Sequence, residues 1–447
     1  LILESIVYGF LTIPNLIKNK EFWKTVRKNA PMILMVMFLI WTFISCMLAP
    51  GAADTVLGEK APKEEEILAE TLNGCYNLKD GFWAFLMYGS VLLATMLLGK
   101  DKIKEKKILI KTFVVSILIL SLITIAITAY ANVGNVEAYS IYAKWSLYPQ
   151  RSIFRNSNHF AYVLSMAIMA ACMLAFTEKK IIEKIFYIVT FAALTYMLII
   201  NDTFGAYLGV MISLVVLLLY GIGNIILFST RKSTMKEEEE LSLLRKILSE
   251  VGIFIIIVAI FTSLSFTVKD ENDNLYAVKN MQVFFRDIGM FENFAQESST
   301  VTSTEEYDSS VSEIAQIGSG RGKVWVRSID LVKQRPLFGY GLECLLFQFN
   351  GQFGINEGRT HNLLLQLLAT VGIPGTFMYF LALGIIFVRL VKNWKTWDDI
   401  EKICVFVGIA YIITSMTGNS TYYTSPYFMM FLGFVAATSW KKDKDVM

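Results

Sequence analysis

Long apolar runs alternate along the chain with short polar connections, and this pattern predicts a helical membrane protein. An α-helix needs about 20 mostly apolar residues to cross the hydrocarbon core of a bilayer. Candidate segments are residues 31–49, 82–98, 109–131, 159–177, 184–200, 203–228, 251–268, 371–391, 403–418 and 424–440. Residues 1–13 are also apolar, but Glu4 and Pro14 favour a short re-entrant or interfacial helix there. We therefore expect an all-α polytopic fold with about ten transmembrane helices.

Lysine and arginine indicate which connections face the cytoplasm. They cluster in residues 18–28, 99–107, 178–184, 231–246, 389–402 and 441–444. Counted in order along ten spans, all these clusters fall on one side, which the positive-inside rule makes cytoplasmic. Both termini are then expected inside, and residues 50–81, 132–158 and 269–370 are expected outside.

These connections divide the chain into three parts. Residues 1–268 form an N-terminal transmembrane bundle of about seven spans, and residues 371–447 supply about three more. Residues 269–370 form one long external loop, much longer than a connection requires, and such loops are usually functional or disordered. Residues 296–312, rich in Ser, Thr and Glu, fit a mobile part of it. Amphipathic helices are expected further on, from residue 318.

Composition agrees with a membrane protein and limits the chemistry. Hydrophobic residues make up 55% of the 447 residues and charged residues only 18%, too few to cover a soluble domain of this size. The five cysteines include no C-x-x-C pair and there are only two histidines, so we expect no structural zinc site. No cofactor and no nucleic-acid partner are expected either. Cys75 and Cys344 fall in external loops, where a disulfide between them is left open.

The first candidate site residue is Arg321, in the sequence Gly-Ser-Gly-Arg-Gly-Lys-Val-Trp at residues 318–325. Trp325, Ile329 and Val332 then recur four and three residues apart, which predicts an amphipathic helix over residues 322–334. Arg321 would lie at its amino end, where backbone N–H groups favour an anion. An ordinary capped surface helix with a solvated arginine is the alternative.

Pro-Leu-Phe-Gly-Tyr-Gly follows at residues 336–341. Pro336 ends the helix, and Gly339 and Gly341 allow a tight turn or a close backbone approach. This segment lacks the lysine and the strand-to-helix context of a P-loop, so it is weak evidence for phosphate binding.

The second candidate is Arg359-Thr-His-Asn362, directly before a leucine-rich segment. Thr360 is a plausible N-cap, which would place His361 in the first turn of a helix and favour its neutral form. A neutral imidazole can accept a proton from a sugar hydroxyl or orient one. An interfacial histidine with satisfied hydrogen bonds is the alternative.

Further polar side chains gather at the outer mouths of spans four and six. They are Arg151, Arg155, Asn156, Asn158, His159 and Asp202. External arginines beside a histidine indicate an anionic ligand, and amides suit sugar hydroxyls. Helix capping by the asparagines and solvation of a turn by Asp202 are the alternatives.

Taken together, these motifs resemble those of the O-antigen ligase and polymerase superfamily. The resemblance rests on Gly-Arg-x-x-x-Trp at residues 320–325, residues 336–341, His-Asn-x-x-Leu-Gln at 361–366, Gly-Ile-x-Gly at 372–375 and Asn-Ser-Asn-x-x-Ala at 156–161. The family often carries an arginine before Gly-Ala at the mouth of span six, where this chain has Phe204. Either one phosphate contact is missing, or Arg151 or Arg155 supplies it.

The resemblance implies a metal-independent glycosyltransferase at the outer face of the bacterial cytoplasmic membrane. Its donor would be a glycan on undecaprenyl diphosphate, and its acceptor a hydroxyl of a glycan, lipid or wall polymer. Carried over, Arg321 would contact the diphosphate and His361 would act as base or orienting group. The other candidates, Arg359 and Asn362 included, would bind substrate.

Two other functions stay open. A metal-dependent polyprenyl-phosphate-sugar glycosyltransferase would need a carboxylate pair in an external loop, for which residues 64–66 and 270–273 are candidates. A flippase for lipid-linked sugars would need charged residues at mid-membrane, where these spans carry few.

Overall fold

The computed structural model describes residues 30–51, 63–74, 80–98, 102–132, 152–154, 156–232, 236–269, 274, 275, 278, 282, 321–418 and 423–442. They divide into two compact units. The first is drawn from Leu1–Gly99, Met281–Lys392 and Ser415–Met447, and the second from Lys100–Asn280 and Asn393–Thr414. The described secondary structure is helical, apart from one isolated antiparallel bridge between Lys269 and Leu275.

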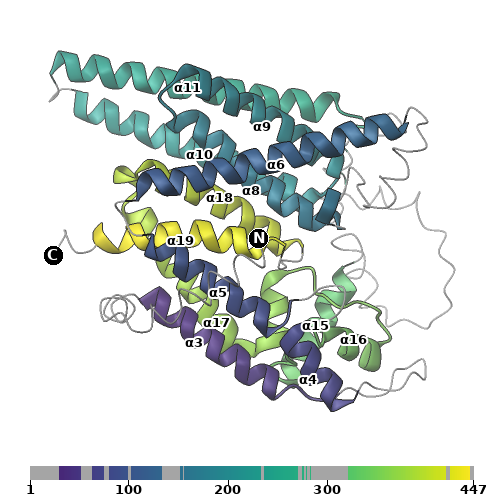
Figure 1. The fold of residues 1–447 in the computed structure, drawn as a ribbon. Coiled ribbons are helices and arrows are strands. Elements are labelled where there is room, and N and C mark those ends of the chain that lie inside the picture. The colour runs from purple at the N-terminus through teal and green to yellow at the C-terminus, as the bar shows by residue number, and fades with distance from the viewer. Residues whose placement is uncertain are drawn as a thin grey trace. The chain divides into compact units, whose positions relative to one another are not determined.

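The first unit pairs long apolar helices (Figure 1). Its helices are α3 (Ala30–Met47), α4 (Glu64–Asn73), α5 (Phe82–Leu97), α15 (Gly322–Gln334), α16 (Leu345–Phe353), α17 (Leu363–Lys392) and α19 (Ser425–Lys442). Helix α3 packs along α17, and α5 packs along α19. Phe38 of α3 lies between Phe85 of α5 and Tyr379 of α17, with ring centroids 6.0 and 5.2 Å away.

In the second unit, the other helices pack around one central helix, α8 (Ser157–Thr177). The helices of this unit are α6 (Ile103–Asn132), α8, α9 (Ile181–Asn201), α10 (Phe204–Arg231), α11 (Glu237–Thr267) and α18 (Asp399–Met416, as far as Thr414), with short 3-10 helices at Ser152–Phe154 and Trp394–Thr396. Every side chain of α8 from His159 to Ala175 is buried. Helix α8 is apolar on all sides, which is typical of a helix enclosed by others.

The structure confirms an all-α polytopic membrane protein. Among the described residues, seven helices are long and apolar enough to cross a membrane: α3, α6, α8, α9, α10, α11 and α17. Helices α5 and α19 are apolar but contribute shorter segments, Phe82–Leu97 and Ser425–Ala436. All ten predicted segments overlap described helices, and the count of ten spans stays a prediction.

Helix α17 is broken at Gly372, where φ is 71°. Pro374 lacks an N–H group, so the carbonyl of Thr370, four residues earlier, loses its helical donor. The loop at residues 336–341 supplies replacements: Tyr340 N donates to Ala369 O and Gly341 N to Thr370 O, each at 2.9 Å. These amides therefore serve the break in α17. A broken helix at membrane depth requires such internal partners.

Helix α3 completes this arrangement. Ser45 Oγ donates to Thr370 O at 2.8 Å and also contacts the Phe338 carbonyl. Trp41 Nε1 donates to Val371 O at 2.9 Å, and the Trp41 ring stacks on Phe338 with centroids 4.8 Å apart. Two motifs noted in the sequence, at residues 336–341 and 372–375, thus form one joint between α3, α17 and the start of the 336–341 loop.

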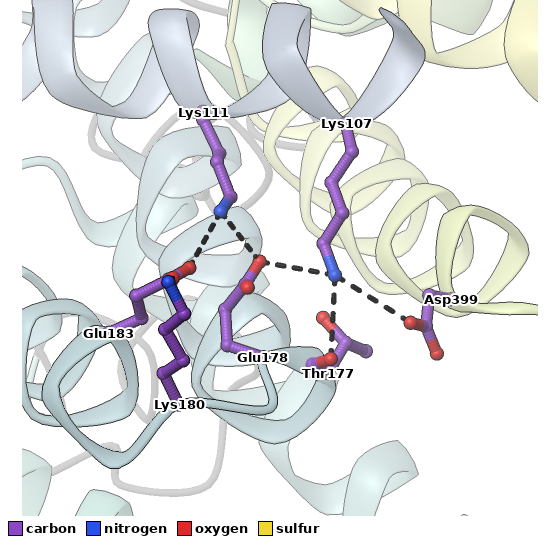
Figure 2. Close-up of polar contacts among 7 residues, drawn as sticks. All are labelled: Lys107, Lys111, Thr177, Glu178, Lys180, Glu183 and Asp399. Carbon is purple, nitrogen blue, oxygen red and sulfur yellow. Dashed lines mark hydrogen bonds and ion pairs between the residues drawn. The ribbon is translucent and has the colours of Figure 1, made fainter. Parts of the chain in front are cut away.

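An ion-pair cluster joins α6, α9, α18 and the connection between α8 and α9 in the second unit (Figure 2). Lys107 and Lys111 of α6 lie 3.1 and 3.0 Å from the buried carboxylate of Glu178. Lys111 also pairs with Glu183 at 2.9 Å, and Lys107 lies 3.7 Å from Asp399. Lys107, which belongs to a basic cluster predicted for the cytoplasmic side, and Lys111, inside the segment predicted as span three, are thus tied to acidic residues of neighbouring elements.

Candidate functional site

Helix α15 presents Arg321 at its amino end. The helix spans Gly322–Gln334, as the sequence predicts, but its buried face carries Val324, Ser328 and Leu331. Val324 and Leu331 pack in a cluster that includes Tyr340, Leu345 and Phe349. Of the apolar residues that predict the helix, Val332 packs against this cluster, whereas Ile329 is 45% exposed.

Two long-range hydrogen bonds anchor the beginning of α15. Trp325 Nε1 donates to Thr360 O at 2.8 Å. Arg321 precedes the first helical residue, and its Nη1 donates to the carbonyl of Thr417. The Gly-Arg-x-x-x-Trp motif therefore fixes its indole at the segment that contains His361 and its arginine at Thr417, after α18.

His361 lies just before α17 rather than in its first turn. The N-cap is Asn362, whose Oδ1 accepts from Leu365 N at 3.1 Å, so the prediction that Thr360 caps the helix is wrong. Thr360 Oγ1 instead donates to Asn362 O at 2.8 Å. His361 has φ of 54°, a left-handed conformation that few non-glycine residues adopt. Sequence-local rules identified the cap region but not which of two polar residues takes it.

The backbone on both sides of His361 is held. Gln366 Oε1 accepts from Thr360 N at 2.9 Å, and Asn362 Nδ2 donates to Met416 O at 2.9 Å. A residue in a sparsely populated conformation costs about 1–3 kcal/mol and persists where its surroundings over-determine it. These contacts supply that constraint at His361.

The imidazole of His361 is kept neutral. Burial, followed by the charges of Arg321 and Arg359, lowers the pKa of His361 from 6.5 to about 4. Glu357 Oε2 lies 3.7 Å from His361 Nε2, too far for a hydrogen bond. The sequence predicted a neutral histidine from the helix N-terminus; here burial and two arginines produce it. A neutral imidazole can accept a proton or a hydrogen bond from a hydroxyl group.

Arg359 is buried among carboxylates. Its Nη1 donates to Asp80 Oδ2 at 3.0 Å, and its Nη2 donates to Glu343 Oε1. Tyr88 of α5 donates its hydroxyl to the other oxygen of Asp80. Asp80 and Glu343 belong to no local sequence motif with Arg359, from which they lie 279 and 16 residues away along the chain.

The other predicted site residues belong to the second unit. Asn156 is the N-cap of α8, and its side chain accepts from Asn158 N at 2.9 Å. His159, in the first turn, is buried. Asp202 ends α9 in a left-handed conformation with φ of 57°. Arg151 and Arg155 lie outside the described residues, as do Cys75 and residues 270–273.

Asn201 brings the two ends of this second group together. Its Nδ2 donates to Ser157 O at 3.1 Å, which places the carboxyl end of α9 beside the amino end of α8. Asn201 was part of the predicted polar turn, but only Asp202 was singled out there. The side-chain amide of Asn201, rather than the neighbouring carboxylate of Asp202, therefore makes the observed hydrogen bond between α9 and α8.

The fold and these sites define a multi-pass α-helical membrane protein with a polar group around a neutral histidine. Residues 189–380 match the family model Wzy_C, described as O-antigen ligase. This match covers less than half of the chain, and it includes Arg321, His361 and the break in α17. It confirms the resemblance to the O-antigen ligase and polymerase superfamily. No curated protein matches the chain.

Proposed function

We propose that the protein transfers glycan from an undecaprenyl-diphosphate-linked donor to an acceptor hydroxyl, as a polymerase or ligase of the O-antigen or capsule type. The transfer takes place at the outer face of the cytoplasmic membrane and needs no metal ion. Both termini face the cytoplasm, as the distribution of Lys and Arg favours.

One observation carries this proposal. Arg321 and a neutral His361 belong to the same polar group of the first unit, inside the segment that matches the O-antigen ligase model. A guanidinium group suits a diphosphate, because it presents several donors in a planar fork. A neutral imidazole suits an attacking hydroxyl. The pair therefore provides the two functions that this transfer requires.

In the proposed reaction, the acceptor oxygen attacks the anomeric carbon of the donor sugar. A bond forms between that oxygen and that carbon, and the bond from the carbon to the diphosphate oxygen breaks. His361 accepts the hydroxyl proton, and Arg321 stabilises the charge that develops on the departing lipid diphosphate. Because a diphosphate is a stable anion, it leaves without needing a proton from a dedicated acid.

The donor also activates the base. With a pKa of about 4, His361 is a weak proton acceptor in the unliganded protein. A bound diphosphate brings negative charge next to Arg321 and offsets part of the cationic field that lowers this pKa. Proton transfer to His361 thus becomes easier when the donor is in place.

The second group, at the ends of α8 and α9, is proposed to contact the sugars. Asn158, His159 and Asp202 offer donors and acceptors to hydroxyl groups, while Arg151 and Arg155 are proposed to meet phosphate or anionic sugar. Asn156 and Asn362 serve helix caps in the structure, so we assign them to holding these sites in shape.

The test is a reconstituted reaction with purified protein, a polyprenyl-diphosphate-linked oligosaccharide and a chelator. A ladder of longer lipid-linked glycans is expected for a polymerase, and transfer only after a separate acceptor is added is expected for a ligase. Activity that disappears with the chelator and returns with a divalent cation would contradict the proposal in favour of a metal-dependent enzyme.

A further inference from the structure

Four buried polar side chains of the first unit meet around Arg359. Arg359 lies between Asp80, just before α5, and Glu343, just after the 336–341 loop, while Tyr88 of α5 contacts Asp80. The side chains of Asp80, Glu343 and Arg359 are 6%, 2% and 5% exposed, respectively. Charges this deeply buried are retained only when they are paired and hydrogen-bonded.

This arrangement keeps Arg359 charged and occupied. Burial disfavours its charge, but Glu343 and then Asp80 outweigh burial, and the pKa of Arg359 is raised. Burial also raises the pKa of Asp80, while Arg359 and Tyr88 oppose that shift. Since Nη1 and Nη2 of Arg359 already donate to carboxylates, this arginine is poorly placed to hold a diphosphate as well.

Arg359 is instead placed to hold a loop. Arg359 is two residues before His361. The residues on either side of His361 are also hydrogen-bonded: Thr360 to Trp325 and Gln366, and Asn362 to Met416. Glu343, like His361, has a left-handed backbone conformation, with φ of 59°. The ion pair between Arg359 and Glu343 therefore connects Glu343 to the loop that contains His361.

We propose that Asp80 and Glu343 are positioning residues for the transfer reaction, acting through Arg359 to fix the loop that presents His361. This inference rests on the proposed function and assigns Arg359 to the support of the site rather than to the donor. Asp80 and Glu343 fix the loop by geometry and also counterbalance the charge of Arg359. Arg359 is one of the two arginines whose charges lower the pKa of His361, so its carboxylate partners also bear on the charge near the imidazole.

Geometry of this kind matters because small displacements are costly. Misplacing a reacting group by about 1 Å can lower a rate about 100-fold. Removal of one carboxylate frees one side of Arg359 and lets the 359–362 segment shift. It also leaves the arginine charge less compensated near His361, which disfavours a protonated imidazole.

Glu343→Gln and Asp80→Asn in the full-length protein, reconstituted in lipid nanodiscs, test this inference. Asp330→Asn is the matched control: it removes a carboxylate from an ion pair in the same unit, 3.1 Å from Arg327 on α15, without touching the loop. Two readouts are needed: kcat and donor KM for glycan transfer, and NMR of 13C-labelled histidine. The chain has two histidines, so a His361→Gln spectrum assigns the signals.

We expect each carboxylate variant to lower kcat about 100-fold with little change in donor KM. The His361 resonance should move and titrate at lower pH than in the wild type, while Asp330→Asn should leave both readouts unchanged. If Asp80→Asn does not fold, Glu343→Gln decides the question.

The inference is overturned if the folded variants keep wild-type kcat, or if donor KM rises while kcat and the His361 resonance stay unchanged. That second pattern would make this group a donor-binding site. If the wild type transfers no glycan, the proposed function fails, and the NMR readout alone still decides whether the carboxylates position His361.

Discussion

The indole of Trp325 donates a hydrogen bond of 2.8 Å to the carbonyl of Thr360, the residue before His361. This bond ties the first turn of α15 to the histidine loop. Because Arg321 is the N-cap residue of α15, four residues before Trp325, this contact relates the arginine to the imidazole. The proposed chemistry depends on that relationship.

The stability of the protein should depend on pH through His361. Its pKa is about 4 when folded, below the ordinary value of 6.5, so the unfolded chain takes up a proton first as the pH falls. The stabilisation is complete above pH 6.5 and is lost as the pH falls towards about 4. Each pKa unit corresponds to about 1.4 kcal/mol, so about 3 kcal/mol is at stake.

Thermal unfolding in detergent at a series of pH values, compared between the wild type and His361→Gln, measures this effect. We expect the wild type to lose stability relative to the variant between pH 6.5 and 4. Parallel pH curves for the two proteins would show that the histidine is not held neutral.

The joint at the break of α17 should be sensitive to small changes. Ser45→Ala removes one of two hydrogen bonds to Thr370 O, which still accepts from Gly341 N, so we expect a loss of about 0.5–1.5 kcal/mol. Ser90→Ala is the matched control, because that hydroxyl is exposed and bonds within its own helix, to Leu86 O. The unfolding midpoint should fall for Ser45→Ala alone, and equal midpoints would contradict the described joint.

Gly372→Ala should be more severe than Ser45→Ala. The added methyl group would collide with the carbonyl oxygen of Leu337, at a residue whose φ of 71° disfavours any side chain. We expect a lower yield of folded protein, measured by size-exclusion chromatography in detergent. A normal elution profile and unfolding midpoint would mean that the backbone can relax there.

Local rules predicted much of the helical framework and less of the site. The bounds of α15, Gly322 and Gln334, could be predicted from chain-breaking residues and hydrophobic periodicity. The fold class could be predicted from the long apolar runs. The partners of Arg359 did not follow, since Asp80 lies 279 residues away in the chain. Such pairings arise when helices distant in sequence pack together, and no local spacing records them.

The motif at residues 336–341 illustrates the same limit. Its glycines correctly indicated a tight turn, with Gly339 and Gly341 at φ of 65° and 83°. The amides of Tyr340 and Gly341 donate to carbonyls at the break of α17. That break depends on Pro374, a residue in another motif. Each motif was visible in the sequence, whereas their mutual hydrogen bonds required the structure.

The ion-pair cluster of the second unit should stabilise the fold without affecting chemistry in the proposed site (Figure 2). Glu178→Gln removes the buried carboxylate shared by Lys107 and Lys111, and because both lysines are partly exposed we expect a loss of about 2 kcal/mol. Lys180→Gln is the control, since that side chain is 77% exposed and lies 3.9 Å from Glu183.

Thermal unfolding in detergent again provides the measurement. The midpoint should fall for Glu178→Gln and stay near the wild-type value for Lys180→Gln. An equal effect of the two substitutions would show that the cluster behaves as an ordinary surface network.

The measurement that tests the central claim most directly is glycan transfer by His361→Ala and Arg321→Ala, with folding checked and Asp330→Asn as control. We predict that loss of the base lowers kcat about 100- to 10,000-fold and loss of the arginine about 100- to 1,000-fold. Arg321→Lys should fall between, because lysine keeps the charge but not the planar fork. Near-normal rates in both alanine variants would contradict the account.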